Sequence, residues 1–187
     1  MAQQTPAVVI STTPSVSLRP GLILLRTFHK ALARSALLVS ALVASPLFAQ
    51  SNNVRISNLS DVAFGAIVNV GADATSTQSL CLYANSANRG YRITASGSAS
   101  GGAFSLSSGS SLLNYEVQWN QAASQTSGTQ LSPNVALTGL ISSATQQTCN
   151  SGPASSASLI LVLRGSELSN ARAGAYSGTL TLLVGPE

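Results

Sequence analysis

The side chains that could do chemistry in this sequence are few and unevenly placed. Serine is abundant, but a serine nucleophile needs a neighbouring base, and the only histidine and the only lysine, His29 and Lys30, both fall within the first 49 residues. Residues 50–187 therefore cannot supply a Ser-His-Asp triad or a Ser-Lys dyad. The lack of imidazole, with only two cysteines, Cys81 and Cys149, also argues against a zinc site. We expect a non-enzymatic chain with no catalytic residue, no metal and no cofactor.

Carboxylates are the remaining candidates for catalysis. Asp61, Asp73 and Glu116 could in principle supply the acid and base pair of a glycosidase, but no further motif frames them. The glycine-rich stretch 97–102 lacks the lysine and the following helix of a phosphate-binding loop. A hydrolase is therefore the least favoured of three hypotheses, and a broad hydrolase screen would test it.

The first 49 residues have the pattern of a secretory leader. Arg26, Lys30 and Arg34 precede an apolar run at 36–44, and a small residue, Ala49, precedes Gln50. That run is shorter than the roughly 20 apolar residues of a membrane span, and the order of basic, apolar and small residues is typical of a signal peptide. We expect export with cleavage after Ala49 and no stable membrane insertion afterwards. The stretch before Arg26 is long for such a leader.

The predicted leader also carries the net charge. The whole chain has a formal charge of +4, but the residues after position 49 include five arginines and five acidic residues, so their formal net charge is zero. With no basic patch left, we do not expect nucleic-acid binding. In an exported protein an even pair of cysteines is typical of one disulfide, here Cys81–Cys149. The alternative is two buried free thiols.

Residues 50–187 have the pattern of one all-β domain, because short apolar runs recur between clusters of Gly, Ser and Asn. Alternation is clearest over 112–119, where Leu113, Tyr115, Val117 and Trp119 fall on one face. We interpret Tyr115 and Trp119 as core residues, with a sugar- or surface-binding aromatic pair as the alternative. No segment after residue 49 has helical periodicity. The other strands are expected at 54–59, 63–70, 78–83, 90–96, 103–106, 136–140, 158–163 and 179–184.

The last predicted strand, 179–184, follows a turn that is rich in Gly and Ser and contains Tyr176. It is apolar on both faces, so it must be covered or it becomes an aggregation-prone edge. Tyr176 is expected to pack at the turn into this strand, as a corner tyrosine does in other sandwiches.

Four elements of the sequence together carry a resemblance to a known family. They are Ala63-Phe64-Gly65, then Leu80-Cys81 followed by Tyr91-Arg92-Ile93, then Phe104-Ser105-Leu106 followed by Leu113-Asn114-Tyr115-Glu116-Val117, and finally the segment from Ala173 to Leu182. The chain resembles the spore coat protein U-like domain, the pilin domain of archaic, Csu-type chaperone–usher pili. The resemblance spans roughly residues 54 to 186, and the last element is its most specific part.

This resemblance implies an immunoglobulin-like β-sandwich that lacks its final strand and is completed by a donor strand. In such pilins a periplasmic chaperone fills the open groove first, and the N-terminal extension of a neighbouring pilin subunit replaces it at the outer-membrane usher. The expected location is the periplasm and then a surface fimbria with a structural or adhesive role. The residues expected along the groove are Phe64, Tyr176, Leu180, Leu182 and Val184.

The sequence departs from the family at two places. Family members usually carry a cysteine in the N-terminal strand that pairs with the position of Cys81, whereas 54–59 has none and Cys149 is the only possible intrachain partner. Only residues 50–53 precede that strand after the predicted cleavage. Either 50–59 is itself the donor, with Val54 and Ile56 as its plugs, or the subunit accepts a donor and gives a poor one, as at a filament tip.

A second hypothesis is a secreted, self-contained sandwich that binds carbohydrate or a surface. In that case the last strand is paired within its own chain. The observation that separates the two hypotheses is whether 54–59 folds back beside 179–184.

Overall fold

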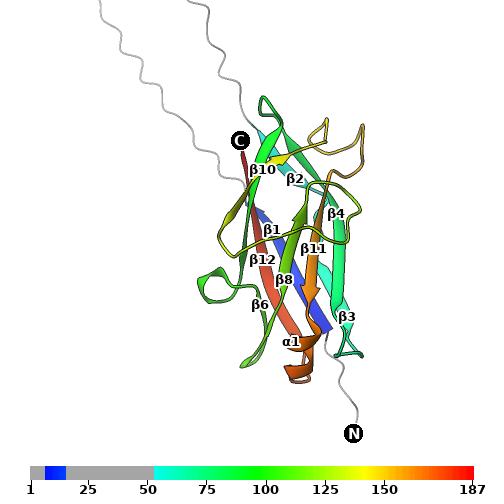
Figure 1. Ribbon diagram of the computed structural model, residues 1–187, viewed down its shortest axis with the longest axis vertical. Coiled ribbons are helices and arrows are strands. Elements are labelled where there is room, and N and C mark those ends of the chain that lie inside the picture. Colours follow the sequence, from blue (N-terminus) through cyan, green and yellow to red (C-terminus); the bar gives the residue numbers. More distant parts are fainter. Residues whose placement is uncertain (1–6, 16–52) are drawn as a thin grey trace, which may run out of the picture. The chain divides into compact units, whose positions relative to one another are not determined.

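The computed structural model describes residues 7–15 and 53–187, with side chains from Asn53 onward. Apart from 7–15, the predicted leader lies outside the described residues. In the described part, two β-sheets form a sandwich-like, all-β fold (Figure 1). This confirms the fold class expected from the alternation of apolar and polar residues.

The first sheet has the strand order β10-β5-β12-β1-β3, with the β6–β7 hairpin attached to β12. The second has the order β2-β4-β11-β8-β9. The bounds of the strands in chain order are β1 Ala7–Ser15, β2 Val54–Ser57, β3 Val62–Ala66, β4 Ala74–Ala84, β5 Gly90–Gly97, β6 Ser105–Ser108, β7 Ser111–Asn114, β8 Glu116–Asn120, β9 Thr129–Gln130, β10 Ala136–Ile141, β11 Ala157–Leu163 and β12 Tyr176–Pro186.

The core lies between the sheets, and β11 is buried along its whole length. Trp119 is 1% exposed and donates its indole N–H to the Tyr91 hydroxyl at 3.0 Å. Tyr115 is 5% exposed and packs against Phe104. Both predicted core aromatics are therefore buried, so the alternative of a surface-binding aromatic pair is wrong.

The expected continuous strand at 112–119 is divided at Tyr115. Before it, β7 pairs with β6 in the first sheet, and after it, β8 pairs with β11 in the second. The chain thus crosses from one sheet to the other at this corner, which period-2 alternation alone does not reveal. A short helix, α1 (Gly165–Asn170), was also not expected from the sequence. It follows the end of β11 and buries Leu168.

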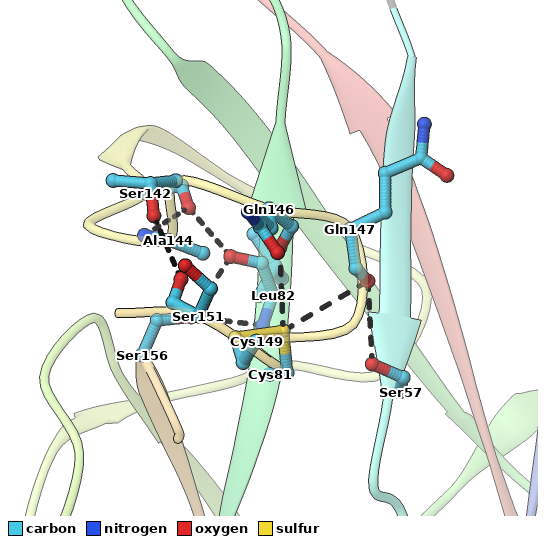
Figure 2. Close-up of a disulfide and its surroundings, with 11 residues drawn as sticks. Ser57, Cys81, Leu82, Ser142, Ala144, Gln146, Gln147, Cys149, Ser151 and Ser156 are labelled. Carbon is cyan, nitrogen blue, oxygen red and sulfur yellow. Dashed lines mark hydrogen bonds between the residues drawn. A yellow bond between two sulfur atoms is a disulfide. The ribbon is translucent and has the colours of Figure 1, made fainter. Parts of the chain in front are cut away.

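The two cysteines form the expected disulfide, with Cys81 on β4 and Cys149 in the loop before β11. Together with Ala144 they make a small buried cluster that is separate from the main core. Figure 2 shows the loop lying against β4, where the Ser142 and Ser156 hydroxyls donate to the Leu82 carbonyl at 2.5 and 2.8 Å. The loop is therefore held against β4 by the disulfide and by hydrogen bonds from serine hydroxyls to the β4 backbone.

Candidate strand-binding groove

The candidate site lies on the edge of β12 that faces away from β5. On one side β12 pairs antiparallel with β5, from Leu180 opposite Gly97 to Pro186 opposite Tyr91. On the other side it pairs in parallel with β1, from Val8 opposite Tyr176 to Ser15 opposite Leu183 (Figure 1). We call the space between β12 and β3 that β1 occupies the strand groove.

The far wall of the strand groove is β3, which pairs antiparallel with β1. The register runs from Ala7 opposite Ala66 to Ile10 opposite Val62 and shifts between Val8 and Val9. Phe64 stands at this shift, between two paired positions of β3, and is partly buried against the core. Gly65 beside it has a φ of 65°, the left-handed region that glycine adopts without strain. The Phe-Gly pair therefore forms a bulge in the groove wall.

The core-facing side of β12 is closely packed. Tyr176, Leu180 and Leu182 are at most 1% exposed and belong to the main core cluster, and Val184 packs against that cluster. The opposite face is more open, because Leu183 is 45% exposed. The expectation that 179–184 is covered on both faces is thus met on the core face only. The five groove residues predicted from the sequence lie on the two strands that border the strand groove.

Local geometry explains the turn into β12. The Tyr176 hydroxyl donates to the Arg172 carbonyl at 2.9 Å, which fixes the turn and gives the tyrosine the corner position expected from the sequence. At Gly178 a Cβ atom would lie 2.9 Å from Leu106 Cδ2. Glycine there lets the β6–β7 hairpin pack closely on β12.

Val54 and Ile56 do not lie in the strand groove. They belong to β2, which pairs antiparallel with β4, placing Val54 opposite Ala84 and Ile56 opposite Leu82. Val54 is 5% exposed within the main core. Of the two alternatives for 50–59, the structure therefore has Val54 and Ile56 in the chain's own sandwich rather than in a donor segment. Segment 7–15, rather than 54–59, lies beside β12.

The sequence does not predict β1, because residues 7–15 fall within the expected leader. Its signal is present, since Val8, Val9, Ile10, Thr12 and Thr13 are β-branched and such residues favour strands. That preference is local, however, and carries no information about which edge the strand joins.

A cavity of about 140 Å³ lies beside one end of the strand groove. Tyr176, which is paired with Val8, lines it, and so does Ile67, which follows the β3 position paired with Ala7. Its other walls are mainly apolar and come from β7, α1 and the turn before β12. The cavity can accept an apolar side chain but offers little for polar chemistry.

Two of the three candidate catalytic carboxylates, Asp73 and Glu116, are bound by the same arginine, whereas Asp61 is exposed at the surface. Arg164 contacts Glu116 through Nη2 at 2.6 Å and Nε at 2.9 Å, and contacts Asp73 through Nη1 at 2.6 Å. The Gly165 N–H also donates to Asp73 at 2.8 Å. This backbone hydrogen bond, with Arg164, lowers the pKa of Asp73, and the hydrogen bonds from Arg164 lower the pKa of Glu116. A general acid needs a raised pKa, so these two carboxylates are suited to holding β11, β8 and the start of β4 together.

No protein-family model matches the chain, and no curated protein matches its sequence. Within residues 7–15 and 53–187, no group of three His, Cys, Asp or Glu side chains could hold a metal ion. In the same part of the chain, no helix is long and apolar enough to cross a membrane.

Proposed function

We propose that this chain is a non-enzymatic, structural or adhesive subunit of a surface fimbria, assembled by the chaperone–usher route through strand complementation. The observation that supports the proposal is which parts of the chain supply the strands of the first sheet. Its strand between β12 and β3 comes from residues 7–15, whereas the rest of the described sandwich comes from residues 53–187. A domain that begins near Gln50 would lack that strand.

Such a domain would have two open edges in one sheet. The edge of β12 would lose eight register positions and that of β3 would lose four. Unpaired backbone groups and newly exposed apolar side chains on a sheet edge promote pairing with other chains. An incoming strand satisfies the backbone groups, and its alternate side chains fill the space next to Leu180 and Leu182. This is the binding that a periplasmic chaperone and a neighbouring subunit would supply.

Expression of the exported domain tests this proposal. A chain that begins at Gln50, produced in the periplasm without a partner, should aggregate or be degraded. Co-expression of the cognate chaperone should raise its soluble yield by at least tenfold. As a matched control, the same chain with residues 7–15 joined ahead of Gln50 by a flexible linker should be soluble without the chaperone. A soluble, stable monomer of the chain that begins at Gln50 would contradict the proposal.

The second candidate is the secreted, self-contained sandwich. The observation that favours it is that β1, from the same chain, already pairs with both β12 and β3. This candidate requires residues 7–15 to stay attached after export. N-terminal sequencing of the exported protein distinguishes the two, because a first residue before Ala7 favours the self-contained domain and a first residue near Gln50 favours the fimbrial subunit.

A further inference from the structure

A polar hollow of about 400 Å³ lies at the end of β8, where the loop to β9 faces β10. β10 forms one edge of the first sheet, and β5 and β12 separate it from β1. β9 forms an edge of the second sheet. None of the three strands around the hollow borders the strand groove, so the hollow stays open whatever strand fills that groove.

The lining of the hollow is neutral and mostly polar. Amides come from Asn120 and Gln121, hydroxyls from Ser127 and Thr129, and a short apolar wall from Leu140. No charged side chain is among the described residues that line it. An anionic ligand would need a cationic partner, and a metal ion would need carboxylates, thiolates or imidazole. The chemistry left is that of a neutral ligand with several hydrogen-bonding groups, in a volume within the roughly 300–1,000 Å³ of small-molecule sites.

Both amides are held in place by the backbone around them. Asn120 Oδ1 accepts the Ala122 N–H at 3.0 Å, and Asn120 Nδ2 donates to the Ser127 carbonyl at 3.0 Å. Gln121 Oε1 accepts the Ile141 N–H at 2.9 Å, which ties the end of β8 to β10 across the two sheets. Each amide nitrogen carries two protons, so one remains on Asn120 and, among the described residues, both remain on Gln121. The donors of the hollow are thus ordered before a ligand arrives, which lowers the entropic cost of binding.

We propose that this hollow binds a neutral saccharide. Sugar hydroxyls both donate and accept, so they match amide and hydroxyl groups without needing a charge, and the C–H face of a sugar ring suits Leu140. The Trp119 ring offers no stacking surface, because the residue is 1% exposed. One site should therefore bind weakly, with a Kd of about 1 mM. The proposal does not rest on strand complementation, because it uses other strands, and it applies to both candidate functions.

A glycan screen tests the ligand class. The full chain is applied to an array of neutral glycans and their sialylated and sulfated counterparts, and the best-retained glycan is then titrated against the isotope-labelled chain by NMR. We expect a neutral glycan to be retained, with amide shifts concentrated at Gly128, Thr129 and Leu140. Stronger retention of the charged counterparts, retention of no neutral glycan, or shifts that are absent from the hollow would each overturn the proposal.

Two variants with matched controls test the site. Gln121→Glu keeps an oxygen for the Ile141 N–H but removes the amide donors, so it should weaken binding about tenfold. Gln130→Glu, at an exposed position on β9 that does not line the hollow, makes the same charge change and should leave binding nearly unchanged. Thr129→Val should weaken binding about fivefold through its lost hydroxyl, whereas Thr138→Val, at an exposed position on β10, should not.

Thermal melts check that each variant is folded, and Thr129→Val keeps the test decisive if Gln121→Glu disturbs the loop. Saccharide binding that survives both variants, or that falls equally in the controls, would overturn the proposal. These outcomes do not depend on the strand groove, because chaperone dependence of the chain that begins at Gln50 is measured separately. A negative result in the saccharide tests therefore leaves the proposed function standing.

Discussion

The edge of β12 and the C-terminal part of β4 both need partners for their backbone N–H and carbonyl groups, and they obtain them in different ways. At β4, the Leu82 N–H donates to the Ser156 hydroxyl at 2.8 Å, and the Leu82 carbonyl accepts from Ser142 and Ser156. The loop that supplies these hydroxyls is joined to β4 by the Cys81–Cys149 disulfide. At β12, the equivalent backbone groups are paired by β1, a segment that precedes the basic and apolar residues of the predicted leader.

Under the proposed function, this difference separates a permanent region of the sandwich, around Cys81, from an exchangeable region, the strand groove. Around Cys81 the polar groups of the strand are satisfied by a nearby covalently attached loop, so no outside chain is needed. At the strand groove the backbone groups of β12 are paired by residues 7–15, which the predicted leader separates from the rest of the sandwich in the sequence. In a domain that must bind an outside strand, we expect unpaired backbone groups at one sheet edge only. The backbone groups of the other edges should be paired within the domain itself.

Removing the disulfide tests the permanent region and has the largest expected effect. The bond closes a loop between residues 68 positions apart, and its loss should lower the free energy of unfolding by about 4 kcal/mol, because the unfolded chain gains conformational freedom. The double variant Cys81→Ala with Cys149→Ala, measured by urea denaturation of the full chain, checks this. Reductant should destabilise the natural chain to a similar extent and leave the variant unchanged. A variant as stable as the natural chain would mean that the hydroxyl bonds alone hold the loop.

Truncation in the wall of the strand groove tests the exchangeable region. Leu182 is 1% exposed and faces the core, so Leu182→Ala should cost about 3 kcal/mol in the free energy of unfolding through lost contacts and a residual cavity. The matched control is the adjacent Leu183→Ala, at a position that is 45% exposed, which should cost less than about 0.5 kcal/mol. Urea denaturation of both variants in the full chain gives the comparison. Equal losses in the free energy of unfolding would show that the two faces of β12 do not differ in packing.

A single hydroxyl on the permanent side should matter less than either of these. Ser156 is 2% exposed and pairs with both the N–H and the carbonyl of Leu82. Ser156→Ala should lower the free energy of unfolding by roughly 2 kcal/mol, because it leaves the buried N–H unsatisfied. Ser155→Ala, at a half-buried neighbouring position, is the control. Hydrogen exchange of the Leu82 amide should speed up only in the first variant, and unchanged protection would count against this role for Ser156.

Acid should weaken the ion contacts of Arg164 by the smallest amount. The pKa values of Asp73 and Glu116 are lowered in the folded chain from ordinary values of 3.8 and 4.5. Their contribution is therefore complete above these ordinary values and is lost as the pH falls through the lower, folded values. Arg164→Met should make the fall in stability below about pH 4 shallower, as measured by thermal melts across pH. Arg55→Met, at an exposed position, should leave it unchanged. An identical acid profile for Arg164→Met would exclude the ion pairs of Arg164 with Asp73 and Glu116 as a source of pH dependence.

Much of the described sandwich could be predicted from local patterns. The alternation that placed Leu113, Val117 and Trp119 on one face gave the core, and two cysteines left only one possible intrachain pair. The groove residues on β12 were predicted through the family resemblance, and in the structure Tyr176, Leu180 and Leu182 are buried in the core while Val184 is partly buried. The division at Tyr115 and the helix α1 escaped prediction, because a change of sheet and a six-residue helix leave no periodic signal.

The sequence by itself determined the all-β class, the buried face of the alternating residues at 112–119 and the absence of a histidine or lysine base after residue 49. These properties depend on residue type and on spacing over a few positions. Only the tertiary structure decided that Val54 and Ile56 pair with β4 and that residues 7–15 lie between β12 and β3. Strand pairing joins backbone groups that any strand presents, so the choice of partner depends on long-range packing of the whole sandwich rather than on the sequence of either strand alone.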